Sequence, residues 1–187
     1  MKRIDVPAIE KAMRDILVAI GEDPEREGLV ETPQRIARMY QEIFSGIHKD
    51  PADSVKFFYA EDHREMVIAK GIPFYSMCEH HVLPFFGIAN IAYIPQDKIT
   101  GISKLARILD TFSRRLQVQE RLTTQIADFI DKSFAPQGVM VVIHAEHLCM
   151  SMRGIQRPGT QIVTSAVRGV FDHDPSTRNE ALSLFKW

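Results

Sequence analysis

The sequence has few cysteines and no excess of charge of either sign. Only 2 of its 187 residues are Cys, and 23 Lys and Arg stand against 24 Asp and Glu, which gives a formal net charge of −1. Two cysteines exclude a disulfide-rich scaffold and favour free thiols or metal ligands in a reducing compartment. The balanced charge gives no reason to expect binding to nucleic acid or to a membrane surface. Any anion site must therefore be built locally.

The sequence also lacks long apolar runs and several common cofactor motifs. No apolar segment approaches membrane-spanning length, and no signal-peptide core follows the basic start, so we expect a cytoplasmic protein. GxGxxG, GxxxxGK[ST] and HExxH are all absent, which removes the common dinucleotide, phosphate-loop and zincin signatures. With 45% hydrophobic residues, the chain can form one globular core.

Hydrophobic periodicity and turn residues predict alternating pairs of helices and strands. The expected elements are, in order, helices over 8–20 and 28–46, strands over 64–74 and 87–95, helices over 103–116 and 117–134, strands over 138–150 and 161–171, and a capped helix over 174–187. In the second helix Thr32 is the expected cap and Gly46 the stop. This order predicts an α+β fold with a mostly antiparallel sheet. We expect an N-terminal helical extension over 1–60 and a catalytic domain over 61–187.

Residues 76–87, SMCEHHVLPFFG, place a thiol, a carboxylate and two imidazoles on consecutive positions between two expected strands. Cys78 and His81 are three residues apart and can bind one ion. Cys149 is the only other cysteine, and we expect it on a strand face shared with His147. Two thiolates and one imidazole suit Zn²⁺, and three protein ligands leave one coordination position for water, as in catalytic zinc sites.

A less specific interpretation applies to each part of this set. Free cysteines are often fully buried, so Cys149 taken alone favours a core residue over a ligand. Cys78 favours a ligand over a core residue, because an apolar core position would not need Glu79, His80 and His81 as neighbours.

Basic side chains recur where helices would display them, together with Ser103. Guanidinium groups bind phosphate oxygens bidentately and lysine adds a point charge, so these residues are candidates for a polyphosphate site. Taken singly, each favours a solvated helix face. The candidates are Lys104, Arg107, Arg153, Arg35 and Arg38.

The chain resembles the GTP cyclohydrolase I family through motifs that recur in the family's order. The matching segments are ETPQRIARMY at 31–40, SMCEHH at 76–81, AYIP at 92–95, GISKLARI at 101–108, QVQERLT at 117–123, HAEHLCMSMRG at 144–154 and TSAVRGVF at 164–171.

The resemblance implies a reaction and a set of catalytic residues. The family opens the imidazole ring of GTP, releases formate and forms 7,8-dihydroneopterin triphosphate without a redox cofactor. It implies that Zn²⁺ is held by Cys78, His81 and Cys149, that His147 protonates nitrogen 7, and that His80 is a second catalytic histidine. A pKa near neutrality suits histidine to both roles.

The resemblance also implies the substrate contacts. Glu120 corresponds to the guanine anchor, Gln119 to a further residue of the base or its loop, and Ser103 to a residue near the ribose and phosphate. The implied triphosphate ligands are Lys104, Arg107, Arg153, Arg35 and Arg38. Arg38 stands where the family also uses lysine, which keeps the charge but changes the geometry.

The family fold is an antiparallel ββααββ unit, the tunnelling fold, assembled into homodecamers with sites shared between subunits. Its product enters tetrahydrofolate or tetrahydrobiopterin biosynthesis.

Two alternatives remain at this point. One is a pterin- or purine-binding enzyme of the same fold with different chemistry, such as an aldolase or reductase. The other is a catalytically silent scaffold that binds zinc and a nucleotide.

Overall fold

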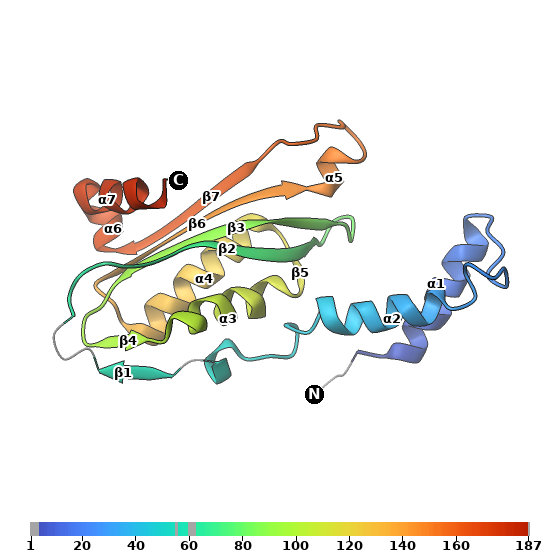
Figure 1. Cartoon of the computed structure of the whole chain (residues 1–187), viewed down its shortest axis with the longest axis horizontal. Helices are drawn as coiled ribbons and strands as arrows, with labels where there is room; N and C mark the ends of the chain where they lie inside the picture. Colours follow the sequence, from blue (N-terminus) through green and yellow to red (C-terminus); the bar gives the residue numbers. More distant parts are fainter. Residues whose placement is uncertain (1–3, 55, 60–62, 187) are drawn as a thin grey trace.

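The computed structural model describes residues 4–54, 56–59 and 63–186, and its centre is a five-stranded sheet in the order β5-β2-β3-β6-β7 (Figure 1). The strands are β2 (Val67–Cys78), β3 (Pro84–Ile94), β5 (Leu116–Gln117), β6 (Gly138–His147) and β7 (Ile162–Gly169). All pairs are antiparallel except the short parallel pair of β5 with β2. The predicted α+β class and its ββααββ order are confirmed.

Two long helices cover one face of this sheet, and two shorter ones cover part of the other. Leu105 and Ile108 of α3 (Ile102–Ser113) and Ile126 of α4 (Gln119–Phe134) are fully buried in the main core. On the opposite face, α6 (Val170–His173) and α7 (Pro175–Phe185) form a smaller core with Met140 and Val142. Residues 140 and 142 alternate with the buried 139, 141 and 143 of the main core, as a strand covered on both faces requires.

Two glycines in the sheet meet different backbone requirements, a close approach between strands at Gly87 and a left-handed conformation at Gly71. At Gly87 of β3, an added Cβ would lie 1.8 Å from the carbonyl oxygen of His144 on β6. At the irregularity of β2, Gly71 takes φ of 70° and donates its N–H to the side chain of the buried Asn90 at 2.8 Å. The bulge therefore has a conformational and a hydrogen-bonding cause.

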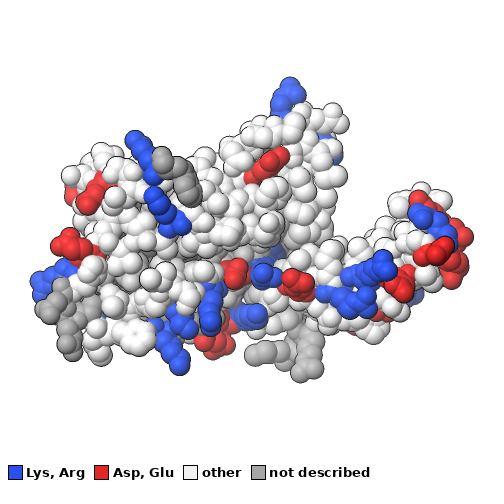
Figure 2. Space-filling view, viewed as in Figure 1, with Lys and Arg blue, Asp and Glu red and all other residues white. Residues whose placement is uncertain are grey.

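The N-terminal segment forms a pair of helices, α1 (Val6–Ala19) and α2 (Thr32–Ile43), that projects away from the sheet (Figure 1). Both helices were predicted, but Thr32 is the first helical residue, Glu31 occupies the cap position without a side-chain cap, and α2 ends before Gly46. Basic and acidic side chains are interspersed along this arm in Figure 2.

Apolar residues of the arm remain exposed, among them Ile16 at 51% and Ile20 at 68%. The apolar face that predicted α1 is therefore only partly covered: Leu17 is buried, whereas Ile16 and Ile20 face solvent in the single chain.

The smaller elements were not predicted. They include η1 (Pro51–Ser54), β1 (Phe57–Tyr59) and β4 (Lys98–Thr100), of which β1 and β4 pair antiparallel. The boundary expected between residues 60 and 61 falls outside the described residues and stays a prediction. The C-terminal helix is capped as predicted, because Asp174 accepts hydrogen bonds from the N–H groups of Ser176 and Thr177.

The close approach at Gly87 predicts a large loss of stability for Gly87→Ala. The new methyl group would force β3 and β6 apart, and we expect the free energy of unfolding to fall by about 3 kcal/mol in urea denaturation. The matched control is Gly101→Ala, where the Cβ would meet only a side-chain atom of Lys104 at 3.8 Å. An equally small effect of both substitutions would contradict the packing at Gly87.

Candidate metal and acid–base site

The sulfur and nitrogen atoms of Cys78, His81 and Cys149 lie within 4.8 Å of one another. Both cysteines are free, Cys78 buried and Cys149 partly buried. Two thiols and one imidazole at this separation fit a single Zn²⁺, because the ion takes sulfur ligands at about 2.3 Å and nitrogen ligands at about 2.0 Å. We call these three residues the metal group.

Strand register brings the metal group together. Both β2 and β6 run antiparallel to β3, so their carboxyl ends lie at the same edge of the sheet. Ser76, Phe85 and His147 occupy one row across β2, β3 and β6. Cys78 and Cys149 each follow this row by two residues.

A tight turn after β2 places His81 beside Cys78. The N–H of Cys78 donates to the oxygen of Leu83 at 2.8 Å, and the N–H of Val82 donates to the oxygen of Cys78 at 2.9 Å. Val82 takes a left-handed φ of 51°. In this turn Nδ1 of His81 lies 3.9 Å from Sγ of Cys78, and Nδ1 of His80 lies 3.8 Å from the same sulfur.

Cys149 reaches the metal group from a different element than expected. The strand ends at His147, and Cys149 lies in the single helical turn α5 (Leu148–Ser151), so the argument that 147 and 149 share a strand face is wrong. β6 loses its β7 partner after Ala145 and its β3 partner after His147, and the backbone turns into α5 at that point. Burial raises the pKa of Cys149, and the neighbouring Cys78 raises it further. A bound cation would favour the thiolate instead.

His147 is held by a buried amide and an aromatic ring. Its ring stacks on Phe85 with centroids 4.6 Å apart, and its Nε2 lies 2.8 Å from Oε1 of Gln119. The amide nitrogen of Gln119 lies within hydrogen-bond distance of three acceptors for its two hydrogens, the oxygens of Ile143 and Ile162 and the hydroxyl of Thr164, so its Oε1 must face the histidine. The neutral His147 ring therefore carries its proton on Nε2 and leaves Nδ1 for other partners.

Glu120 lies next to these groups and is an exposed residue in the first turn of α4. Burial lowers the pKa of His147, and the negative charge of Glu120 acts in the opposite direction. Gln119, by contrast, is only 1% exposed. The amide hydrogens of Gln119 already bind protein acceptors. The adjacent residues Gln119 and Glu120 therefore differ, because the first is buried and bonded within the protein and the second is exposed to solvent.

The expected phosphate-binding residues fall into two separate groups. Arg153 lies at the metal group, with Nη1 3.3 Å from Nε2 of His81. Ser103 and Lys104 lie at the start of α3, next to β4 and at the opposite end of the sheet from α5 (Figure 1). The structure thus does not bring these two residues to the metal group of their own chain.

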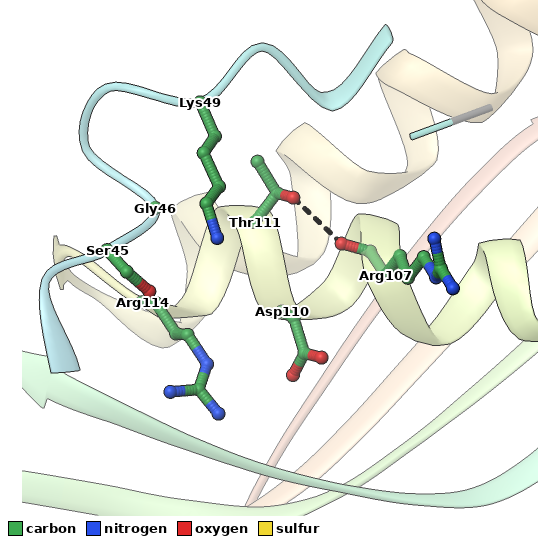
Figure 3. Close-up of a pocket in the computed structure, with 7 residues that line it drawn as sticks. All are labelled: Ser45, Gly46, Lys49, Arg107, Asp110, Thr111 and Arg114. Carbon is green, nitrogen blue, oxygen red and sulfur yellow. Dashed lines mark hydrogen bonds between the residues drawn. The ribbon is translucent and has the colours of Figure 1, made fainter. Parts of the chain in front are cut away.

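Arg107 and the two arginines of α2 also lie apart from the metal group. Arg107 lines a pocket of about 390 Å³ with Lys49 and Arg114, between α3 and the segment after α2 (Figure 3). Arg35 and Arg38 are exposed on the projecting arm, where Arg35 pairs with Glu31 at 2.6 Å.

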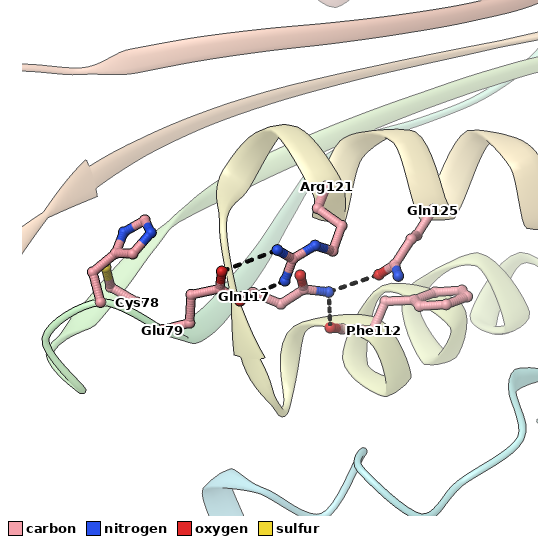
Figure 4. Close-up of polar contacts among 7 residues, drawn as sticks. Cys78, Glu79, Phe112, Gln117, Arg121 and Gln125 are labelled. Atoms are coloured by element: carbon pink, nitrogen blue, oxygen red, sulfur yellow. Dashed lines mark hydrogen bonds and ion pairs between the residues drawn. The ribbon is translucent and has the colours of Figure 1, made fainter.

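Sequence reasoning missed a polar network beside the metal group. Arg121 binds Glu79 through two hydrogen bonds, and the amide of Gln117 donates to the oxygen of Phe112 and to Gln125 (Figure 4). Oε1 of Gln117 is buried and has no partner among the described residues. The presence of Glu79 inside the ligand-rich segment was the available signal, but the sequence does not show which residue faces it.

No helix in the described part of the chain has the length and apolar character needed to cross a membrane.

Fold and site together define an α+β protein with a Cys-His-Cys metal group and an adjacent half-buried histidine. The chain belongs to the GTP cyclohydrolase I family, whose model matches residues 9–186. It is 56% identical to GTP cyclohydrolase 1 of Geobacillus sp. (strain WCH70), over 100% of both chains. It is 54% identical to GTP cyclohydrolase 1 of Bacillus cytotoxicus, over 100% of this chain and 99% of the relative.

One solved structure, the archaeosine synthase QueF-Like in the apo form, covers 58% of this chain and 97% of its own. The TM-score is 0.49 and the sequence identity is 17%.

The geometry of the metal group predicts that Cys149→Ser loses zinc without unfolding. A hydroxyl is a poorer zinc ligand than a thiolate, and we expect the zinc affinity to fall by more than about 100-fold. Elemental analysis after dialysis measures zinc per chain, circular dichroism checks the fold, and Met152→Leu on the neighbouring exposed position is the control. Full zinc content in Cys149→Ser would remove this residue from the metal group.

Proposed function

We propose that this protein is a zinc-dependent GTP cyclohydrolase I, which opens the imidazole ring of GTP, releases formate and forms 7,8-dihydroneopterin triphosphate. The observation that supports it most strongly is the metal group with His80 and His147 beside it, in a chain of this family. We further propose a cytoplasmic enzyme whose product enters tetrahydrofolate or tetrahydrobiopterin biosynthesis.

Cys78, His81 and Cys149 would hold the zinc. When bound, Zn²⁺ supplies Lewis acidity and lowers the pKa of water to about 7, which makes a hydrolytic nucleophile available near neutral pH. The protein's part is to fix three ligands from two segments and to leave the remaining position for water and substrate.

His147 would donate the proton that nitrogen 7 of guanine needs when carbon 8 is attacked. Because Nε2 is bonded to Gln119, the proton available to substrate is the one at Nδ1 of the protonated ring. A lowered pKa makes the imidazolium a stronger acid, which favours this transfer. His80, next to the sulfur of Cys78, is the second proposed proton carrier.

Glu120 would select guanine. An ionised carboxylate can accept hydrogen bonds from the ring imide and the exocyclic amine together, and adenine cannot offer this pair. Gln119, which we had expected to contact the base or its loop, would serve the base site by orienting His147, since its amide hydrogens are already bonded. Base selectivity would follow from unpaired polar groups when the wrong purine enters.

The triphosphate would be bound by residues of more than one subunit. Arg153 lies beside the metal group, whereas the other expected ligands are on α2 and α3. We therefore propose a homo-oligomer, a decamer as in the family, in which a neighbouring copy supplies the missing positive charge. Exposed apolar residues on α1 and α2 support association of this kind. The residues supplied across the interface would be Ser103, Lys104, Arg107, Arg35 and Arg38.

The test of the activity is turnover of GTP and ATP before and after removal of metal. We expect formate and a fluorescent oxidised pterin from GTP but not from ATP, loss of both products after chelation, and recovery with added Zn²⁺. Zinc-loaded protein that binds GTP without forming formate would contradict the proposed activity and favour a silent scaffold.

The divided site predicts complementation between two inactive variants. Cys149→Ser lacks a metal ligand and Lys104→Gln lacks a phosphate ligand, and each alone should have little activity. Refolded together, they should regain activity at about a quarter of their sites, because each site needs one intact part from each of two copies. The measurement is formate release by the mixture compared with each variant refolded alone. A mixture no more active than its components would place Lys104 and Cys149 in one chain's site.

A further inference from the structure

Glu79 lies in the turn over residues 78–83, which carries Cys78 and His81 of the metal group and which we call the metal-binding turn. Its side chain, however, binds an arginine. Its Oε2 lies 2.5 Å from Nη1 of Arg121, and its Oε1 lies 3.0 Å from Nη2 of the same side chain. In Figure 4 the carboxylate of Glu79 points toward Arg121 of α4, and Cys78 lies farther from that arginine. With both oxygens engaged, Glu79 is not available as a metal ligand.

The backbone of the same residue is also held. Its N–H donates to the oxygen of Gln117 at 3.0 Å, next to the parallel pairing of Cys78 with Gln117. Residue 79 comes one position after one metal ligand and two before another. Fixing its main chain and its side chain therefore fixes the turn that carries His80 and His81.

The other partner belongs to the end of α4 that carries the proposed base site. Arg121 directly follows Gln119, which holds His147, and Glu120, the proposed guanine anchor. A single helical turn thus contacts the metal-binding turn through residue 121 and the proton donor through residue 119. Glu120, the residue between these two, is the one that would bind the guanine base.

Stability alone does not explain this pair. Its side chains are 44% and 31% exposed, and ion pairs at such positions usually contribute little to the free energy of folding. Two parallel hydrogen bonds between guanidinium and carboxylate do, however, fix distance and orientation.

We propose that Glu79 and Arg121 are positioning residues whose bidentate ion pair holds the metal-binding turn in register with the base-binding end of α4. This inference rests on the proposed function, because the geometry matters only if metal and guanine must be presented to each other. Neither residue touches the reacting atoms. Each acts through its neighbours, Arg121 through Glu120 and Glu79 through His80 and His81.

The experiment compares Glu79→Gln, Arg121→Gln and the double variant in the zinc-loaded full-length protein. We expect kcat for GTP to fall by about 10- to 100-fold in each single variant, with a smaller change in KM. The double variant should be no worse than the poorer single one, because both lose the same contact. Arg121→Lys keeps the charge without the two-pronged geometry and should recover only part of kcat.

The chain offers a matched control on the same helix. Asp128 of α4 pairs with Arg168 of β7 at 2.7 Å, with comparable exposure of 39% and 33%, but contacts neither the metal group nor Glu120. Asp128→Asn should change the thermal unfolding midpoint about as much as Glu79→Gln does, while kcat stays within about threefold of wild type. An equal loss of kcat in the control, a wild-type kcat in Glu79→Gln, or additive losses in the double variant would each overturn the proposal.

A second readout separates this inference from the activity itself. Transfer of zinc from the protein to a chelator needs no GTP and should be faster in Glu79→Gln and Arg121→Gln than in wild type and Asp128→Asn. Wild-type protein that holds zinc but does not turn over GTP would remove the proposed function, while faster zinc release in the two variants would still support the positioning of the turn. Zinc release at the wild-type rate in both variants would overturn it.

Discussion

The site depends on the direction of the strands on either side of β3. Because β2 and β6 both run antiparallel to β3, they run parallel to each other and end at one edge of the sheet. The row Ser76–Phe85–His147 fixes the register, and a slip of one residue would turn the side chains of a strand to the opposite face. The metal group is thus a consequence of sheet register, completed by the turn after β2 and by α5.

The first turn of α4 adds the second constraint. It meets the same edge of the sheet, where Gln119 is buried against β6 and β7 and sets the proton position on His147. Arg121, which follows Glu120 in the sequence, binds Glu79 of the metal-binding turn. The helix therefore joins the metal group, the proposed acid–base histidine and the proposed base anchor, whereas the proposed phosphate-binding residues of α2 and α3 would be presented by another copy.

Residue chemistry allowed the metal group to be predicted, because two cysteines and a clustered histidine leave few other combinations. Local sequence pattern failed where tertiary contacts decide: β6 ends at His147, where its pairing with β3 stops, so Cys149 lies in α5, and Thr32 starts α2 without capping it. The pair Glu79–Arg121 could not be predicted, since its members are 42 residues apart and meet only when β5 joins β2. The contact of Gln119 with His147 could not be predicted either, because nothing in the sequence shows that Gln119 is buried while the adjacent Glu120 is exposed.

The central claim is that one edge of this sheet holds a zinc ion through two thiolates and one imidazole. The most direct measurement is a crystal structure of the zinc-loaded protein with diffraction data on both sides of the zinc absorption edge. The account predicts one anomalous peak per chain, at about 2.3 Å from both cysteine sulfurs and about 2.0 Å from a ring nitrogen of His81. A peak bound by Glu79 or His80 in place of one of these ligands, or zinc only elsewhere on the chain, would contradict it.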